Sequence, residues 1–95
     1  MGRSARERPL RLGAKLLQIR QSLELTQQQM LFALGLDEKV FPSAVSGYEL
    51  GNREPPLLVL LKYARLAGVI MDVLVDDALD LPPRLPNAKR ARLRR

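Results

Sequence analysis

The chain has 95 residues, of which 46% are hydrophobic, and a net charge of +6, which suits one small domain with a modest core. It contains neither cysteine nor histidine, which excludes disulfides, thiolate nucleophiles, imidazole bases and the usual zinc ligands, so we expect no cofactor and no metal. The N-terminus is polar and charges interrupt the apolar runs, so we expect a cytoplasmic protein without signal peptide or membrane span.

The positive charge is concentrated near the two ends of the chain. Residues 1–11 and 82–95 hold ten of the 16 Lys and Arg residues but only one acid, Glu7. The other six cations lie between them with nine acids, so the middle of the chain is mildly acidic. Basic arms beside a folded domain are typical of proteins that attract a polyanion, although basic ends can also serve solubility alone. We expect flexible arms at 1–11 and 82–95 around one domain at 12–81.

Apolar spacing predicts the first helix. Leu12, Leu16, Ile19 and Leu23 fall on one stripe of an amphipathic helix of about three turns. Arg20 lies next to that stripe, where its charge would be partly desolvated. We therefore expect Arg20 to have a partner.

A short second helix is predicted over residues 27–34. Thr26 and Gln29 have the spacing of a capping box, and Gly35 suits a left-handed helix ending. Phe32 is left on the outside of this helix. The residues expected to face the core are Met30, Leu31 and Leu34.

The third predicted helix runs from about Pro42 to Leu50 and is closed by a glycine at 51. Val45 and Tyr48 should face the core, with Glu49 beside them. Gly47 inside a helix costs up to about 1 kcal/mol relative to alanine. Either another group approaches closely there, or the helix tolerates the loss.

A loop at 51–56 leads to a fourth helix, predicted from Leu57 to Ala67, and to one or two helical turns at 70–76. Prolines prevent a further helix beyond residue 81, and the basic segment that follows is expected to be disordered. No segment has a convincing strand pattern, so the fold class is all-α with five helices. The residues expected to be buried in this half are Leu57, Leu60, Leu61, Ala64 and Leu74.

The spaced residues of these segments carry a family resemblance; they are Leu16, Ile19, Arg20, Thr26, Gln27, Leu34, Gly35, Leu36, Val45, Ser46, Tyr48, Glu49, Gly51, Pro55, Leu57, Leu60, Leu61, Ala64, Gly68, Val69, Asp72 and Leu74. Together they closely resemble the Xre/Cro, or lambda-repressor-like, helix-turn-helix domain. The resemblance implies a five-helix domain whose third helix enters the DNA major groove, usually as a homodimer on a near-palindromic operator.

The resemblance also implies roles for individual residues. Arg20 would pair with Glu49 and brace the third helix against the first, which agrees with the charges found beside buried stripes. Gln27 and Gln28, at the start of the second helix, would contact phosphate, although Gln27 could be an ordinary surface glutamine. Further phosphate contacts are expected after the third helix and in the basic tail; the residues are Asn52, Arg53, Arg84, Lys89 and Arg90, of which Arg53 could instead be a solvated loop charge.

The sequence departs from the family between its second and third helices. Residues 37–41 form an insertion whose apolar side chains could fold over Phe32. The candidate base or groove contacts are Lys39, Ser43, Ala44, Ser46 and Gly47, and no residue at the base-reading positions can make the bidentate contacts of arginine or glutamine. Specificity would then come from close approach, DNA shape, water or the arms.

Apolar residues also occur where the family pattern is polar. We expect them to form a homodimer surface, with scattered surface residues as the alternative. They are Leu58, Val59, Ile70 and Val73.

Three classes of function are possible for this sequence. The favoured one is a DNA-binding transcriptional regulator that represses by occupancy. The alternative is an adaptor or antitoxin-like subunit that uses the same fold to bind a protein partner, with tails that bind nucleic acid nonspecifically. An enzyme with a magnesium cluster at Asp76, Asp77 and Asp80 is disfavoured, because no base or nucleophile accompanies these acids.

Overall fold

Helix α1 (Leu12–Ser22) packs against three other helices, α3, α4 and α5. The structure is a computed structural model that describes residues 7–36 and 42–87. Leu16 and Ile19 are fully buried, and Leu12 is 5% exposed. The apolar stripe predicted for the first helix is therefore confirmed.

The described residues form five helices and no strand, so the all-α class is confirmed. Helix α2 (Gln27–Ala33) begins with the predicted capping box, in which the Gln29 amide donates to Thr26 Oγ1 at 3.0 Å and the Thr26 amide donates to Gln29 Oε1 at 2.8 Å. Gly35 has a φ of +74°, the left-handed ending expected there. The other helices are α3 (Pro42–Leu50), α4 (Leu57–Ala67) and α5 (Met71–Val75).

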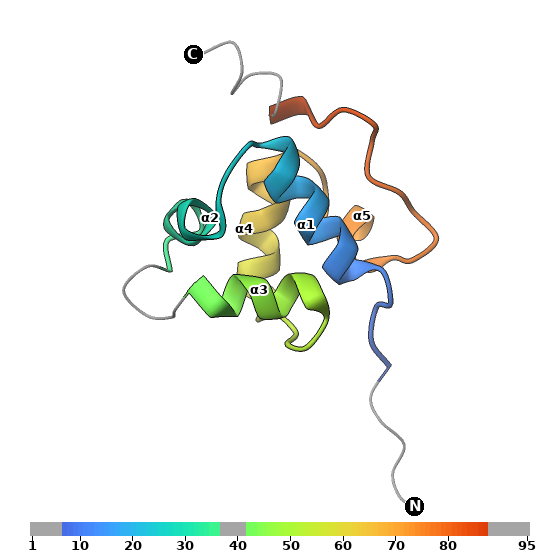
Figure 1. Cartoon of the computed structure of the whole chain (residues 1–95). Coiled ribbons are helices and arrows are strands. Elements are labelled where there is room, and N and C mark those ends of the chain that lie inside the picture. Colours follow the sequence, from blue (N-terminus) through green and yellow to red (C-terminus); the bar gives the residue numbers. More distant parts are fainter. Residues whose placement is uncertain (1–6, 37–41, 88–95) are drawn as a thin grey trace, which may run out of the picture.

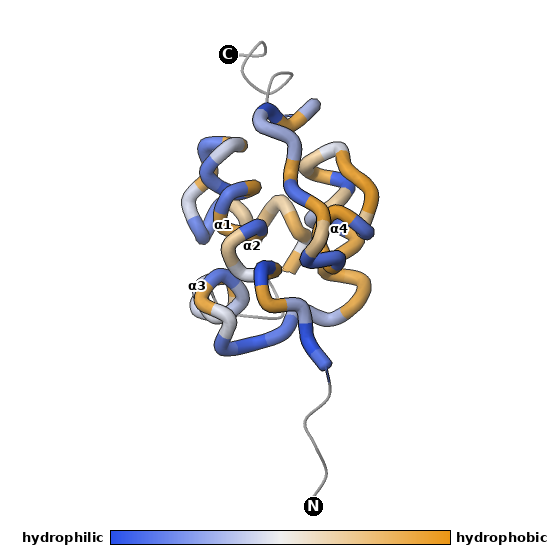
Figure 2. Tube along the Cα trace, turned by 90° about the vertical axis from the view of Figure 1, so that its right-hand side faces the viewer, coloured by the Kyte–Doolittle hydropathy of each residue, from blue (hydrophilic) through white to orange (hydrophobic). Residues whose placement is uncertain are grey.

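Helix α3 lies at one end of the molecule, across the bottom of Figure 1. The N-terminal segment leaves from this same end, whereas the chain after α5 passes along the side of the molecule to the opposite end. In Figure 2 the loop after α3 is hydrophilic, as is most of the N-terminal segment, and both lie close to this end. The two ends of the described chain therefore emerge on opposite sides of the helical core.

The core collects apolar side chains from all five helices. Met30, Leu31, Val45, Tyr63 and Leu74 are each at most 1% exposed, and so the inward faces predicted for α2 and α3 are confirmed. Among the described residues, no helix combines the length and apolar character needed to cross a membrane.

The predicted buried face of α4 is partly wrong. Leu57 is 69% exposed, whereas Val59 and Tyr63 are buried. Residues 57–61 are all apolar, so more than one stripe has helical spacing. The stripe that packs is the one that brings the Tyr63 ring and two alanines into the core, namely Val59, Leu60, Tyr63, Ala64 and Ala67.

The Tyr63 hydroxyl is buried and has no hydrogen-bond partner in the part of the chain that the structure describes. Burial, followed by the nearby Glu49 carboxylate, raises the pKa of this hydroxyl above its usual range.

The packed part of the chain extends beyond the domain boundary predicted at residue 81. Leu85 is 1% exposed and belongs to the core. The Asn87 side-chain amide donates to the carbonyls of Arg65 and Leu66 at 3.0 Å, near the end of α4. The prediction of a disordered tail from residue 82 is therefore wrong for residues 82–87, because the Leu85 side chain and the Asn87 amide hold this segment against the helices.

Candidate nucleic-acid interface

A buried ion pair joins α1 to α3, the helix at one end of the molecule. Arg20 Nε donates to Glu49 Oε2 at 2.6 Å and Nη2 donates to Oε1 at 3.1 Å, while Nη1 donates to the Leu25 carbonyl at 2.9 Å. The Glu49 side chain is only 5% exposed. Hydrogen bonding to Glu49 raises the pKa of the Arg20 guanidinium above its ordinary value. The predicted pair is confirmed, and it fixes the orientation of α3 from behind.

Gln27 belongs to this buried cluster and does not have a free side chain. Its Nε2 donates to Glu49 Oε1 at 3.1 Å, so the amide extends the ion pair to the start of α2. This bond argues against an ordinary surface glutamine at Gln27, while its phosphate contact stays a prediction. Its neighbour Gln28 is exposed and remains available for a phosphate contact.

The outward face of α3 is narrow and made of small residues. Ser43 is exposed and Ser46 is half-buried. Ala44 is 1% exposed and packs in the core, so its expected place in a groove is wrong: its methyl group lies on the same side of the helix as Val45 and Tyr48. Two serines are therefore the polar groups that the described part of α3 offers to a ligand.

Gly47 is covered by the side chain of Arg53. A Cβ placed on Gly47 would lie 2.8 Å from Arg53 Cδ and 3.0 Å from Cγ, so the absence of a side chain makes room for the arginine. The Arg53 guanidinium lies 6.0 Å from the centre of the Tyr48 ring, a cation–π distance. The close approach suspected at Gly47 is thus the loop arginine, and Gly47 itself is buried rather than exposed to a groove.

The turn after α3 brings Arg53 back over the helix. Gly51 has a φ of +82°, and the amides of Asn52 and Arg53 both donate to the Gly47 carbonyl, at 2.9 and 3.2 Å. The side chains of Asn52 and Arg53 are exposed. These two predicted phosphate contacts therefore lie at the C-terminal end of α3, on the molecule's surface.

The segment before α1 is fastened to the segment after α5. The Asp77 carboxylate accepts hydrogen bonds from the amides of Leu10 at 2.8 Å and Arg11 at 3.0 Å. Arg11 donates to the Asp77 carbonyl at 2.7 Å and forms an ion pair with Asp80. These bonds lower the pKa of both aspartates, through backbone amides at Asp77 and through Arg11 at Asp80. The prediction of a flexible arm at residues 1–11 is therefore wrong for residues 10 and 11.

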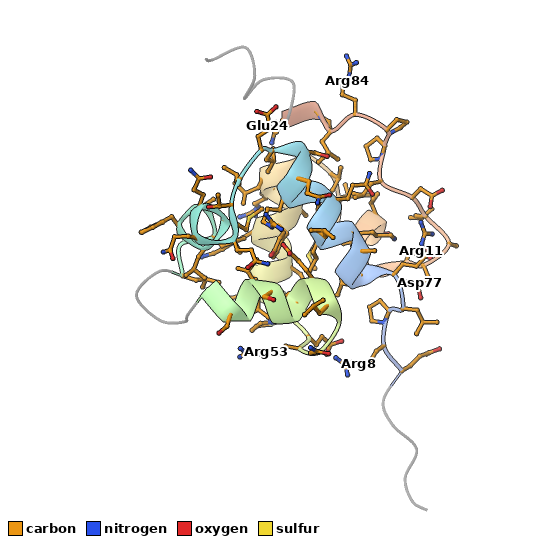
Figure 3. The ribbon with its side chains drawn as sticks, in the orientation of Figure 1. Arg8, Arg11, Glu24, Arg53, Asp77 and Arg84 are labelled. Carbon is orange, nitrogen blue, oxygen red and sulfur yellow. The ribbon has the colours of Figure 1, made fainter. Side chains whose placement is uncertain are left out.

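The structure separates two of the predicted phosphate contacts, Arg53 and Arg84. In Figure 3, Arg53 lies at the α3 end of the molecule, whereas Arg84 lies at the opposite end. Lys39, Lys89 and Arg90 lie outside the described residues. One more cation that was not predicted for the site, Arg8, lies at the same end as Arg53.

The predicted dimer surface is only partly exposed. Leu58 and Ile70 are 68% and 66% exposed, but Val59 is 7% exposed and Val73 packs against the core. Leu58 lies at the start of α4 and Ile70 beyond its end, so the exposed members do not share one end of the helix.

Sequence reasoning missed two contacts that fix α1. Lys15 is 3% exposed and its Nζ donates to the carbonyls of Val73 at 2.7 Å and Asp76 at 3.0 Å, which caps α5. A Cβ on Gly13 would lie 2.7 Å from the Glu49 carbonyl oxygen, so α1 and α3 touch through their backbones there. Lys15 could have been noticed in the sequence, because it is a charged residue within the apolar stripe of α1.

The three acids after α5 serve the chain itself: Asp77 and Asp80 hold the N-terminal segment, and Asp76 Oδ1 accepts from the Ala78 amide at 2.9 Å. Within residues 7–36 and 42–87, no group of three or more potential ligands has the geometry to hold a metal ion. Comparison of the chain with protein-family models, curated proteins and solved structures gave no match.

Proposed function

We propose that the chain is a helix-turn-helix DNA-binding regulator of the lambda-repressor-like class, and that it represses transcription by occupying its operator. The observation that carries this proposal is the bidentate Arg20–Glu49 pair, which braces α3 from behind while its serines and the adjacent Arg53 face outward. A rigid helix at one end of the molecule, with cations beside it, is suited to a DNA groove.

The small outward residues of α3 define how such a helix would recognise DNA. Ser43 and Ser46 can bond to base edges or phosphates with little discrimination. Without long side chains between them, the helix backbone can approach the groove floor closely. We therefore propose that sequence preference combines weak serine contacts with DNA shape, and that Gln28, Asn52 and Arg53 supply phosphate contacts.

Selection from random DNA duplexes with the full chain, at a stated salt concentration, tests this proposal. We expect an enriched site, and a pair of half-sites about 10 base pairs apart if the protein binds as a dimer. Replacing Ser43 and Ser46 by alanine should change the enriched sequence without changing the salt dependence. The control is Gln21→Ala, an exposed polar residue on α1, which should leave the enriched sequence unchanged. Failure to enrich any sequence would contradict sequence-specific binding.

A second candidate is a protein-binding adaptor of the same fold. The exposed apolar side chains Phe32, Leu57 and Leu58, which are 57%, 69% and 68% exposed, favour it. A stoichiometric complex with a protein partner that forms after nuclease treatment, and that is lost in Leu57→Ser with Leu58→Ser, would support the adaptor. The homodimer expected from the sequence would instead show self-association that depends on Leu58 and Ile70, the exposed members of its predicted surface.

A further inference from the structure

The fastening of residues 10 and 11 determines where the preceding residues lie. Because Asp77 holds the amides of Leu10 and Arg11, the chain enters α1 in one direction, and Arg8 is placed beside the loop after α3. Figure 3 shows Arg8 and Arg53 at the same end of the molecule, with Arg11 and Asp77 above Arg8 in this view.

Arg8 and Arg53 line one open cleft of about 300 Å³ between this segment and the end of α3. The stem of Arg53 is anchored over Gly47, which directs its guanidinium to the surface. Arg8 Nε lies 3.9 Å from Glu54 Oε2, whose residue lines the same cleft, and the Arg8 side chain is 48% exposed, so it is about half open to solvent. Two guanidinium groups on one cleft suit a phosphate, which accepts several charge-assisted hydrogen bonds.

We propose that Arg8 and Arg53 together bind one DNA backbone phosphate beside α3, and that Asp77 is the positioning residue that places Arg8 in this cleft. The inference rests on the proposed function, since it assumes that the α3 end of the molecule faces DNA. It adds a phosphate position to that surface and gives the acidic segment after α5 a role in binding a polyanion.

The positioning role of Asp77 and a simple charge effect predict opposite changes in DNA affinity when Asp77 is replaced. Replacing an aspartate by asparagine removes a negative charge, so electrostatics alone predicts tighter binding to DNA. Positioning predicts weaker binding, because asparagine keeps only one acceptor oxygen, so one of the Leu10 and Arg11 amides loses its partner and the segment that carries Arg8 is held less firmly. Asp72→Asn is the matched control: it removes one exposed acid of α5 that lines a pocket with Arg8 but, among the described residues, forms no side-chain hydrogen bond to the N-terminal segment.

The test measures duplex affinity against salt for the full chain and for Arg8→Ala, Asp77→Asn, Asp72→Asn and the Arg8→Ala/Asp77→Asn double variant. Arg8→Ala should lower the log–log slope by at most about 0.9 and the affinity by at most about eightfold at about 0.1 M salt, the values for one whole phosphate contact, because Arg53 stays at the same phosphate. Asp77→Asn should also weaken binding, whereas Asp72→Asn should not. Arg8→Ala should have less effect in the Asp77→Asn background, since Arg8 is already held less firmly in the cleft. Circular dichroism melting checks that each variant is folded.

Binding by Asp77→Asn as tight as or tighter than that of the unaltered chain would overturn the positioning role, and an unchanged slope in Arg8→Ala would overturn the site. A second measurement does not need DNA: inorganic phosphate is titrated while the Arg8 and Arg53 Nε–H resonances are followed by NMR. Both should shift together, and the Arg8 shift should be smaller in Asp77→Asn. If the chain binds no duplex but shows these shifts, the phosphate site stands and the proposed function falls; absent shifts overturn the site.

Discussion

At the scale of single residues, the Arg20–Glu49 pair joins α1 to α3 through two hydrogen bonds. Both carboxylate oxygens of Glu49 are bonded to Arg20, and Gln27 adds a bond to one of them. The two members differ in exposure, because the Arg20 side chain is 16% exposed and that of Glu49 only 5%. Removing the arginine therefore leaves the more deeply buried charge without its ionic partner.

We expect Arg20→Met to lower the free energy of unfolding by about 3 kcal/mol, the lower end of the range for a broken buried pair, since Arg20 is not wholly buried. Glu49→Leu should cost less, because the stranded guanidinium lies nearer to solvent. The Arg20→Met/Glu49→Leu double variant should recover most of the loss, since apolar residues often replace a buried pair at little cost. Urea denaturation of the four proteins measures these differences. Equal losses in the two single variants would contradict the proposed asymmetry.

At the scale of helices, two glycines have different surroundings, one in α1 and the other in α3. Gly13 faces backbone atoms, the carbonyl oxygens of Glu49 and Tyr48 at 2.7 and 3.0 Å from a built Cβ. Gly47 faces the side chain of Arg53, which can rotate away. The same substitution should therefore have different consequences at the two positions.

Gly13→Ala should lower the free energy of unfolding by about 1–2 kcal/mol, because overpacking against backbone costs more than the gain in helix propensity of up to about 1 kcal/mol. Gly47→Ala should leave stability almost unchanged, since the propensity gain offsets the lost packing of Arg53, about 0.5–1 kcal/mol for an exposed cation–π contact. Thermal melting measures both. If Gly47→Ala proved as destabilising as Gly13→Ala, the Arg53 side chain would not be able to shift away from an added methyl group as expected.

At the scale of the whole molecule, the two basic ends emerge in different places. Arg8 lies at the α3 end, whereas Asn87 is fastened near the end of α4, away from α3. Residues 88–95 contain five cations and residues 1–8 contain three, together with Glu7. Counting charges alone would assign the larger share of DNA binding to the C-terminal segment.

The position of the two ends predicts instead that the N-terminal segment contributes more to DNA binding than the C-terminal segment. Removing residues 1–8 should reduce the slope of log affinity against log salt more than removing residues 88–95, each lost phosphate contact accounting for about 0.9. Removing residues 82–95 should also destabilise the fold, by about 2–5 kcal/mol, because it deletes the buried Leu85 side chain. Salt titrations and melting curves of the three truncated chains test this. A larger slope change on loss of residues 88–95 would contradict the expected order.

The sequence by itself determined the features that depend on neighbouring residues. The capping box of α2, the glycine endings and the inward residues of α1, α2 and α3 follow from spacing within a few helical turns, and the structure has them as expected. Arg20 and Glu49 could also be paired in advance, because each lies beside a buried stripe and the family resemblance places them together.

The tertiary structure alone decided which of several equivalent faces is buried and which distant groups meet. An apolar run such as residues 57–61 has no unique stripe, so the rotation of α4 depends on the neighbours it packs against. Ala44 is small enough for either environment and was placed in the core by the packing of α3. The contacts of Asp77 with Leu10, and of Lys15 with Val73, join residues 67 and 58 positions apart. Such contacts leave no local pattern, because they exist only once the helices have fixed their relative orientation.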